Sequence, residues 1–588
     1  MAALSGTELG GGAPAPGRRR RFRFGLGPAM CTMVLVVMLV VVLYPMILLL
    51  YSTFLVDQPD GSARLGLDYW IHSWGEAGMG LSIYNTFKRV VFTEAVAVPA
   101  AILLAWLVTR TDLPGKKLVD SFCWIAFFLP ALPVLMGWIL LFDPEYGLAN
   151  QAYTALTGAD RGPFDIYTFA GMVFAHLAAR SVAAKYIFLA PAFRNLDSAM
   201  EEASRIAGSG PLMTLRRISL PILMPAFLIM LCISLLHSLE SFEIELILGP
   251  PTGFYVFSTK IYQVINEDPP LFGVATVLAM AVLISLLPLI FYQQRVSASR
   301  SFVTVTSHFS ANLLRLRKLR LPVFAVVFLF GLAITAVPVA FLLMGTFMNL
   351  FGFFAVPEPW TLEHWHSVLS DPPLIDATVN TMIMGGSAAL FGVMWYSLVA
   401  YISARTRYPG RGIIDFLSWL PASLPGIILG LALLWTFLNV PVFRPLYGTI
   451  VVLVVALVLN SISTGVQLLK GNMVQLGAEL EEASYVTGGS WLYTFRRVVL
   501  PLMAPALVSV GLLTFASAVR QVSAIAMLVT GDTRPLSMLQ VDNMVDGSFE
   551  AAAVIGTLIV ILTLAVAGLA RFIAARMGFS GVTSGAAG

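Results

Sequence analysis

Twelve apolar stretches, each about as long as a bilayer is thick, constrain this chain more than any other feature. A helix needs about 20 apolar residues to cross a membrane. The stretches lie at residues 29–52, 84–109, 118–142, 166–192, 221–247, 272–293, 322–345, 378–403, 413–437, 447–470, 502–529 and 549–571. Of the 588 residues, 58% are hydrophobic and only 12% are charged, against about a quarter in soluble domains. The sequence therefore predicts an all-α polytopic membrane protein with twelve transmembrane helices, and it excludes a single soluble core.

Basic residues indicate how these helices are oriented. Arginine and lysine collect in the N-terminal tail and in the loops after every second stretch, whereas the other loops hold about one each. Because short cytoplasmic loops are rich in Lys and Arg, we expect both termini in the cytosol. The cluster "GRRRRFRFG" would also fit a twin-arginine signal or a nucleic-acid patch. The long apolar run that follows favours anchoring of an uncleaved first helix, without nucleic acid as a partner.

One charged segment of the chain occurs twice. Residues 200–221 read "MEEASRIAGSGPLMTLRRISLP", and residues 480–501 read "LEEASYVTGGSWLYTFRRVVLP", 280 positions later without a gap. "YNTF" and "RTDLPGKKLVD" recur as "VNTM" and "RTRYPGRGIID", 295 positions later. The repeat predicts two fused six-helix halves. Since six is even, both halves have the same orientation and are related by a pseudo-twofold axis along the membrane normal.

The repeat also divides the chain into segments. We expect a disordered basic cytosolic tail at 1–28, a first half at 29–293, a cytosolic linker at 294–321, a second half at 322–571 and a cytosolic C-terminal tail at 572–588. The duplicated loops occupy about 195–221 and 475–501 and face the cytosol.

Each duplicated loop predicts two short helices joined by a glycine turn, a shape suited to docking. An ordinary amphipathic loop would also carry these charges, but solvation does not require copied small residues such as Ala203 and Ser204. We therefore expect both loops to dock on a partner. The residues assigned to this surface are Glu201, Glu202, Ala203, Ser204, Gly208, Arg216, Arg217, Glu481, Glu482, Ala483, Ser484, Gly488, Arg496 and Arg497.

Both loops resemble the EAA loop of the membrane permeases of bacterial binding-protein-dependent ABC importers. The family pattern is Glu-Ala-Ala, a Gly four positions after the last Ala, and later Ile-x-Leu-Pro. It is filled by Glu202, Ala203, Ser204, Gly208, Ile218, Leu220 and Pro221, and by Glu482, Ala483, Ser484, Gly488, Val498, Leu500 and Pro501. Serine replaces the second Ala in both copies, and valine replaces Ile in the second.

The resemblance implies a permease in the bacterial inner membrane whose loops are coupling helices. It implies two copies of a cytosolic ATPase subunit and a periplasmic or lipid-anchored solute-binding protein as partners. The chain has no phosphate-binding G-x-x-x-x-G-K-[ST] motif. ATP is therefore expected on the partner, with no cofactor, metal site or catalytic residue on this transport subunit.

The solute is indicated by two further stretches, which begin at Ser238 and Asp546. They resemble fused permeases for ferric iron, which favours ferric iron or a ferric chelate. Thiamine, polyamine and phosphonate permeases are near alternatives. An ion-coupled secondary transporter would also have twelve helices and parallel halves but would not explain the duplicated loop. A structural membrane protein is a third alternative.

Three ionisable residues near the outer end of two spans have two interpretations. Glu240 and Arg520 each lie 19 residues after the proline that opens their span, Pro221 or Pro501. That is about 28 Å along a helix, which reaches the outer interface. If the helix continues to Leu248, Glu240 and Glu243 share an intramembrane face and would line a pathway or gate with Arg520. The alternative is that Glu240 and Arg520, which have opposite charges at equivalent positions, form an interfacial or structural ion pair.

The histidines and cysteines, which are common metal ligands, are better explained here as interfacial or packed side chains. His364 and His366 are two positions apart beside Glu363, but the matching segment "LDYWIH" lacks this spacing. An outer amphipathic helix with an interfacial tryptophan explains them better. The cysteines Cys31, Cys123 and Cys232 lie inside apolar runs and suggest neither disulfides nor a metal site.

Overall fold

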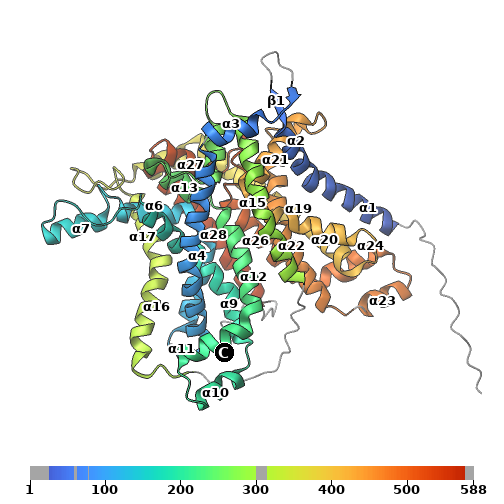
Figure 1. Ribbon diagram of the computed structural model, residues 1–588, viewed down its shortest axis with the longest axis horizontal. Helices are drawn as coiled ribbons and strands as arrows, with labels where there is room; N and C mark the ends of the chain where they lie inside the picture. Colours follow the sequence, from blue (N-terminus) through green and yellow to red (C-terminus); the bar gives the residue numbers. More distant parts are fainter. Residues whose placement is uncertain (1–25, 58–62, 77, 299–313, 478, 577–588) are drawn as a thin grey trace, which may run out of the picture.

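The computed structural model describes residues 26–57, 63–76, 78–298, 314–477 and 479–576 (Figure 1). Within them, nine helices are long and apolar enough to cross a membrane, or up to twelve spans if each of three bent helix pairs counts as one. The bent pairs are Lys116–Phe128 with Ala131–Phe142, Arg411–Ser423 with Gly426–Asn439, and Trp491–Leu502 with Ala504–Arg520. Each of the twelve apolar stretches coincides with one of these helices or bent pairs.

The first half consists of fifteen helices and a short hairpin. The helices are α1 (Leu26–Met38), α2 (Tyr44–Ser52), α3 (Asp68–Glu76), α4 (Met79–Arg110), α5 (Lys116–Phe128), α6 (Ala131–Phe142), α7 (Leu148–Thr157), α8 (Phe169–His176), α9 (Val182–Arg194), α10 (Ser198–Ile206), α11 (Pro211–Thr214), α12 (Leu220–Leu239), α13 (Glu243–Leu248), α14 (Phe257–Ile265) and α15 (Phe272–Ala298). Three π-helical turns, η1 (Leu39–Leu43), η2 (Leu177–Ser181) and η3 (Leu215–Ser219), join α1 to α2, α8 to α9 and α11 to α12. Strands β1 (Leu55–Asp57) and β2 (Ala63–Leu65) pair antiparallel, with Leu55 opposite Leu65.

The second half repeats this order. Its helices are α16 (Arg320–Ile334), α17 (Ala336–Gly345), α18 (Glu363–Ser370), α19 (Pro372–Arg405), α20 (Arg411–Trp419), α21 (Gly426–Asn439), α22 (Ile450–Gln475), α23 (Glu479–Val486), α24 (Trp491–Thr494), α25 (Leu500–Leu502), α26 (Ala504–Arg520), α27 (Leu536–Val545) and α28 (Phe549–Arg576). The π-helical turn η8 (Phe495–Val499) occupies the place of η3. Short 3-10 turns are η4 (Pro250–Thr252), η5 (Arg317–Leu319), η6 (Leu420–Ser423), η7 (Arg444–Leu446) and η9 (Gly531–Thr533).

The third span of each half is broken at a proline. The chain turns by 104° between α5 and α6, where Pro130 precedes the second helix. It turns by 113° before α21, where Pro425 has the same place. Proline has no N–H to donate and its ring clashes with the preceding turn, so it interrupts a helix. The sequence patterns "FLPALPV" and "WLPASLPG" therefore produce the same bend twice.

Matching hydrogen bonds recur in the two halves. Thr86 Oγ1 accepts a hydrogen bond from Phe257 N at 3.0 Å, and Thr381 Oγ1 accepts one from Leu536 N at 2.8 Å. The neighbouring Asn85 donates through Nδ2 to the Tyr255 carbonyl, and Asn380 donates in the same way to Arg534. Each Asn-Thr pair thus holds the segment that opens α14 or α27 against the second span of its own half, which explains why "NT" is copied.

Each half begins with a helix that packs on the other half. Helices α1 and α2 contact α20 and α21, and Thr32 Oγ1 lies 3.0 Å from Tyr408 Oη. Conversely, α16 contacts α5, and α17 packs on α6. A Cβ on Gly137 of α6 would lie 2.0 Å from the Pro338 carbonyl oxygen of α17, so only glycine permits this approach.

Helices α15 and α16 both extend into the segment 294–321 that the sequence predicts as a linker. Helix α15 continues to Ala298, and α16 begins at Arg320. Near its second end, Leu314 forms a parallel bridge with Thr111 of the first half, and Asp112 Oδ1 accepts a hydrogen bond from Leu316 N at 2.7 Å. The predicted tails at 1–28 and 572–588 lie largely outside the described residues.

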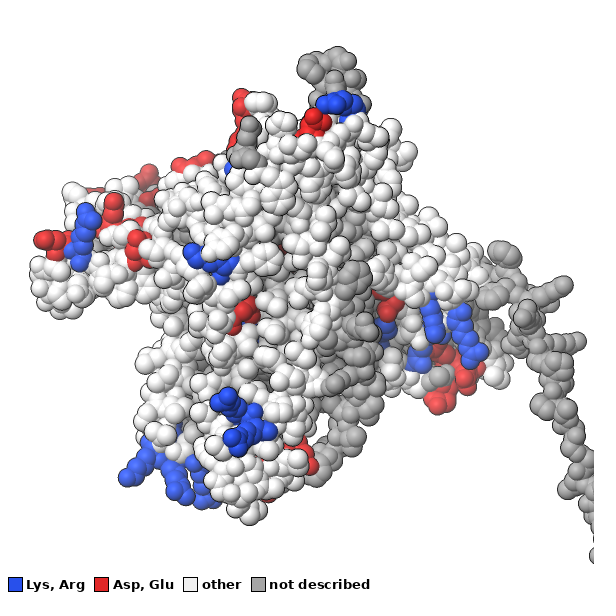
Figure 2. Space-filling model, in the orientation of Figure 1, with Lys and Arg blue, Asp and Glu red and all other residues white. Residues whose placement is uncertain are grey.

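The surface separates into an apolar side and charged ends. Basic side chains gather around α11 and the start of α16 at the bottom of Figure 2 and around α23 and α24 at the right, while much of the surface between them carries no charge. One large core of buried apolar side chains, including Leu135 and Ile428, extends across both halves. The two basic ends are the ones that carry the duplicated loops.

Candidate functional site

The duplicated loops adopt the same local structure. In the first, α10 is followed by α11, η3 and α12; in the second, α23 is followed by α24, η8 and α25. The turn residues Gly208 and Gly488 have φ angles of 84° and 88°, in the left-handed region that favours glycine. Backbone hydrogen bonds from Ser209 N to Ser204 O and from Gly489 N to Ser484 O close the two turns. The predicted helix-turn-helix is therefore correct in both copies (Figure 1).

The first acid of each loop is bonded to the chain itself. Glu201 Oε1 accepts a hydrogen bond from Ser219 Oγ at 2.6 Å, and its Oε2 lies 3.2 Å from Arg110 Nε. Arg110, the last residue of α4, also donates to the Leu196 carbonyl at 2.6 Å. These bonds fasten the loop to the end of the second span.

The second loop is fastened in the same way. Glu481 Oε1 lies 3.4 Å from Arg405 Nε, and its Oε2 accepts a hydrogen bond from Tyr401 Oη at 2.8 Å. Arg405 ends α19 and donates to the Leu476 carbonyl. The sequence assigned Glu201 and Glu481 to the docking surface, but their carboxylates are engaged inside the chain, so they position the loops.

The copied serines also bond internally. Ser204 Oγ lies 3.1 Å from Thr214 Oγ1, and Ser484 Oγ lies 2.8 Å from Thr494 Oγ1. Each bond joins the first short helix of a loop to the second. Copying of these serines and threonines therefore follows from the internal geometry, whereas Ala203 and Ala483 are exposed and available to a partner.

The outer face of each loop combines acids with large apolar residues. Glu202 is partly buried and Glu482 is exposed, and the arginine pairs 216–217 and 496–497 are exposed. Ile206 and Val486, at equivalent positions, are 88% and 87% exposed. Further exposed apolar side chains at equivalent positions are Met200 and Leu480, Leu212 and Leu492, and Met213 and Tyr493. Exposed apolar residues that recur at equivalent positions agree with the contact surface expected for the loops. Sequence reasoning missed them, although they lie in the aligned repeat.

Glu240 and Arg520, at equivalent positions, do not form an ion pair with each other. Glu240 Oε2 lies 3.4 Å from His237 Nδ1, and a Cβ on Gly426 would lie 3.2 Å from its Oε1. Arg520 donates to the Phe127 carbonyl at 2.9 Å, with its guanidinium over the Phe127 ring. Each residue thus reaches the broken span of the opposite half.

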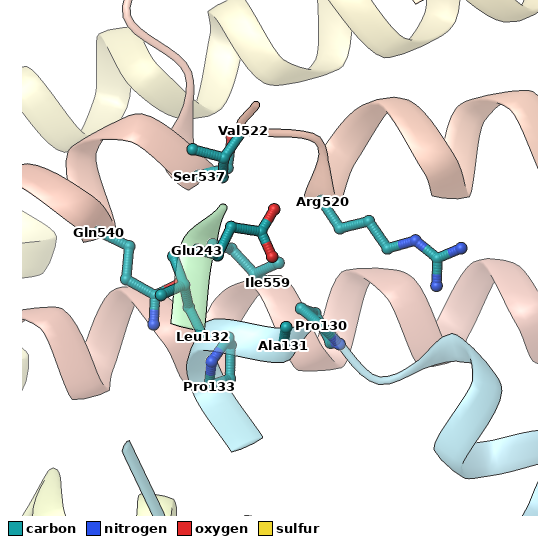
Figure 3. Close-up of a pocket in the computed structure, with 10 residues that line it drawn as sticks. All are labelled: Pro130, Ala131, Leu132, Pro133, Glu243, Arg520, Val522, Ser537, Gln540 and Ile559. Atoms are coloured by element: carbon teal, nitrogen blue, oxygen red, sulfur yellow. The ribbon is translucent and has the colours of Figure 1, made fainter. Parts of the chain in front are cut away.

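Glu243 lies on a separate short helix, because α12 ends at Leu239 and α13 begins at Glu243. Residues 240–242 therefore interrupt the helix between Glu240 and Glu243, although both residues lie in the same span, Pro211–Leu248. Glu243 lines a small cavity between the halves (Figure 3). The other lining residues are Pro130, Ala131, Leu132, Pro133, Arg520, Val522, Ser537, Gln540 and Ile559.

A buried charge cluster in the first half was missed from the sequence. Arg89 and Glu245 have fully buried side chains, with Arg89 Nε 2.8 Å from Glu245 Oε1. The same oxygen lies 2.9 Å from His176 Nε2, and Ser241 Oγ donates to Glu245 Oε2 at 2.7 Å. Arg89 also donates to the Ser238 carbonyl at 2.6 Å. The cluster fixes α13, and with it Glu243, against α4 and α8.

A second buried ion pair lies five residues, or about one and a half turns, further along α4. Lys185 Nζ is 3.1 Å from Glu94 Oε1, and Ser234 Oγ donates to Glu94 Oε2 at 2.9 Å. The repeat positions in the second half are Met384 for Arg89, Ala389 for Glu94 and Gly465 for Lys185. The sequence did contain a signal for these pairs: Arg89 and Glu94 both lie inside the predicted span 84–109, and the repeat copies neither of them.

Other candidate metal residues form no cluster. Within the described ranges, no group of three or more His, Cys, Asp or Glu side chains could hold a metal ion. His364 lies on α18 with its Nε2 3.3 Å from the Asn349 carbonyl. Cys31, Cys123 and Cys232 are buried free thiols.

The chain resembles proteins of one family in both halves. The model of the family described as binding-protein-dependent transport system inner membrane component matches residues 97–301 and 388–579. A ferric transport system permease protein of Actinobacillus pleuropneumoniae is 28% identical over 68% of this chain and 58% of its own length. The chain thus spans little more than half of that relative.

Two other relatives differ in coverage. A probable ABC transporter permease protein of Sinorhizobium fredii is 27% identical over 82% of this chain and 86% of its own length. A sulfate transport system permease protein of Salmonella typhimurium is 28% identical over 34% of this chain and 76% of its own length. Among solved structures, a bacterial ABC transporter involved in alginate import matches 47% of this chain and 96% of its own chain, with 20% identity and a TM-score of 0.38.

Proposed function

The chain belongs to the family of binding-protein-dependent transport system inner membrane components, and from this premise we propose that it is the permease subunit of an ABC importer. As a permease it moves a solute from a periplasmic or lipid-anchored binding protein to the cytoplasm and makes or breaks no covalent bond. ATP is hydrolysed on two copies of a separate cytosolic subunit. Both termini and both duplicated loops face the cytosol.

The matched pair of loops is the observation that carries this proposal. Each loop presents an acid, Glu202 or Glu482, beside the exposed apolar side chains of Ile206 or Val486. Two equal surfaces suit two copies of one partner. An ion-coupled secondary transporter would need no such surfaces.

The ion pairs inside the loops connect each loop mechanically to a membrane-spanning helix. A partner that pulls on α10 also pulls on Arg110 through Glu201, and Arg110 ends the second span. Arg405 and Glu481 connect α23 to α19 in the same way. Closure of the two ATPase subunits would thus rock the two halves about the pseudo-twofold axis, giving alternating access.

We propose ferric iron, free or as a chelate, as the solute. The support is that ferric transport system permease proteins align with about two thirds of this chain, over 68% and 63% of its length. Sulfate permeases also align, over one third. Thiamine, polyamines and phosphonates remain the alternatives, and the cognate binding protein decides among them.

The test is ATP-dependent uptake by the reconstituted complex of the permease with its ATPase and binding protein. Changing Glu202 and Glu482 together to Ala should reduce uptake about tenfold or more, with normal membrane insertion, because the loops lose their charged contacts with the ATPase. Uptake that persists after ATP depletion but stops when ion gradients collapse would instead indicate a secondary transporter. Normal uptake by the E202A/E482A variant would show that the loops do not dock through these acids.

A further inference from the structure

The end of the linker between the halves is bonded to the end of the second span. Leu314 N donates to the Arg110 carbonyl at 2.9 Å, and Asp112 N donates to the Leu314 carbonyl at 2.9 Å. Leu316 N donates to Asp112 Oδ1 at 2.7 Å, and Arg320 Nε donates to the Asp112 carbonyl at 3.1 Å. We call these four hydrogen bonds the linker clasp.

The linker clasp supplies partners to backbone groups that α4 leaves unpaired. The last four carbonyls of a helix have no partner inside it, and Arg110 is the last residue of α4. Arg110 is 5% exposed and the next residue, Thr111, is 0% exposed. Buried backbone groups need a hydrogen-bond partner. The clasp is therefore part of the way in which the second span ends.

Apolar packing joins the linker to the first duplicated loop. Leu314 and Leu316 are partly buried and pack on the apolar cluster that contains Leu113, Leu196 and Leu215. The last two of these residues belong to the loop at 195–221. The end of the linker and the first loop are thus parts of one packed unit.

Arg110 is the residue that connects the linker to the loop. Its guanidinium holds Glu201 of α10 at 3.2 Å, and its carbonyl accepts the hydrogen bond from Leu314. A small cavity lies between these groups, lined by Trp106, Arg110, Glu201, Arg205, Pro211, Thr214 and Leu314. In Figure 1 the start of α16 and the first loop lie at the same end of the molecule.

The repeat separates the role of Asp112 from the folding of the loop. The position equivalent to Asp112 is Arg407, whose side chain is exposed. A guanidinium has no acceptor, so this side chain cannot accept a hydrogen bond from a linker N–H. The second loop nevertheless adopts the same helix-turn-helix as the first. The carboxylate of Asp112 is therefore not required to form a loop of this kind.

We propose that the linker clasp positions the first duplicated loop and joins it to α16, so that ATPase closure moves the loop, the second span and α16 together. Glu201 transmits the pull to Arg110, and the clasp transmits it to the helix that begins at Arg320. Helix α16 precedes the spans of the second half but packs on α5 of the first. Asp112 is the positioning residue. The inference rests on the proposed importer function and adds an element through which that function operates.

The test compares Asp112→Ala with Asp112→Asn in the full complex of permease, ATPase and binding protein in lipid nanodiscs. D112A removes the acceptor of the Leu316 N–H, whereas D112N keeps an oxygen there. Amide hydrogen exchange, followed by mass spectrometry, should become at least fivefold faster in residues 198–219 and 314–320 of D112A, because these segments open locally more often. Exchange in residues 479–499 of D112A, and throughout D112N, should keep the wild-type rate.

The second readout is the ATP hydrolysed per iron taken up, measured in proteoliposomes supplied with ⁵⁵Fe(III) citrate. D112A should raise this ratio at least threefold, because hydrolysis continues while the first loop transmits less motion, and D112N should not. Arg320→Ala removes another bond of the clasp from an exposed position. It should shift both readouts in the same direction, and it decides the question if D112A fails to fold. Lys318→Ala and Arg407→Ala, which also remove exposed cations, are the controls and should be normal.

Unchanged exchange of residues 198–219 in D112A and R320A would overturn the proposal. Faster exchange with an unchanged ratio of ATP to iron would also overturn it, as would a D112N variant that behaves like D112A, since the charge of Asp112 would then be what matters. Wild-type iron uptake without ATP would refute the importer function, and absence of ⁵⁵Fe uptake would refute iron as the solute. In both of these cases the exchange rates still decide whether the linker holds the loop.

Discussion

At the scale of single residues, the buried charged side chains of the first half serve to hold helices in position. Arg89 and Glu245 are fully buried and form an ion pair, and His176 and Ser241 also contact the Glu245 carboxylate. Such a pair is worth little net stability, but loss of one member leaves an uncompensated charge. We therefore assign the pair a positioning role, since it fixes the short helix that carries Glu243.

The repeat allows this assignment to be tested with residues from the same protein. Glu245→Gln should destabilise the protein by about 3 kcal/mol, because Arg89 loses its counter-ion. The double variant R89M/E245I places the residues of the second half, Met384 and Ile525, at both positions, and should be more stable than E245Q because no buried charge remains. Thermal unfolding of the detergent-solubilised variants measures both; a double variant less stable than E245Q would contradict the unpaired-charge explanation.

At the scale of elements, the duplicated loops are rigid units. Each is closed by a Ser–Thr hydrogen bond, turned by a left-handed glycine and fastened by a Glu–Arg pair to the end of a span. The apolar side chains that remain outside are then held at fixed positions. This rigidity is what a loop needs if it is to transmit motion instead of absorbing it.

The glycine turns give a prediction at this scale. Changing Gly208 and Gly488 together to Ala imposes the left-handed cost of roughly 1–2 kcal/mol at each turn, although no neighbour lies within 4 Å of either added Cβ. We expect weaker co-purification of the ATPase subunit and severalfold lower uptake. Gly210→Ala is the matched control, because Gly210 has φ of −68° and open space. Unaltered ATPase binding by G208A/G488A would show that the turn conformation is not needed for docking.

At the scale of the whole molecule, the two halves are held by exchanged helices. Helices α1 and α2 pack on the second half, and α16 and α17 pack on the first. The halves have the same fold but different charges: in the part of the chain that the structure describes, the pairs Arg89–Glu245 and Lys185–Glu94 lie in the first half, and their repeat positions in the second half are uncharged. Duplication therefore explains the shared architecture, and divergence between the halves explains their different buried charges.

The packing of α17 on α6 predicts that replacing one glycine, Gly137, has a strong effect. Gly137→Val would place Cβ 2.0 Å from the Pro338 carbonyl oxygen and force α6 and α17 apart. We expect a loss of about 3 kcal/mol from overpacking and a smaller monodisperse peak in size-exclusion chromatography. Gly386→Val on α19, where no atom lies within 4 Å, should behave like the wild type. Equal behaviour of the two variants would mean that the α6–α17 contact does not hold the halves together.

The sequence by itself determined the periodic features. Apolar length located the spans, because a bilayer demands about 20 apolar residues, and proline marked two of the three bends. The copy 280 positions later identified the duplicated loops, including their glycine turns.

Only the tertiary structure decided which charges meet. Glu201 and Glu202 are adjacent acids of one motif, yet the first is bonded to Arg110 and the second lies at the loop surface. Arg520 and Phe127 are 393 positions apart, and the Arg520 guanidinium reaches the Phe127 carbonyl at 2.9 Å because the two halves pack against each other. The pattern of apolar and polar residues along the chain indicates whether each segment lies in lipid or in water. The pairing of buried charges depends on how separate helices cross, and only the folded chain determines those crossings.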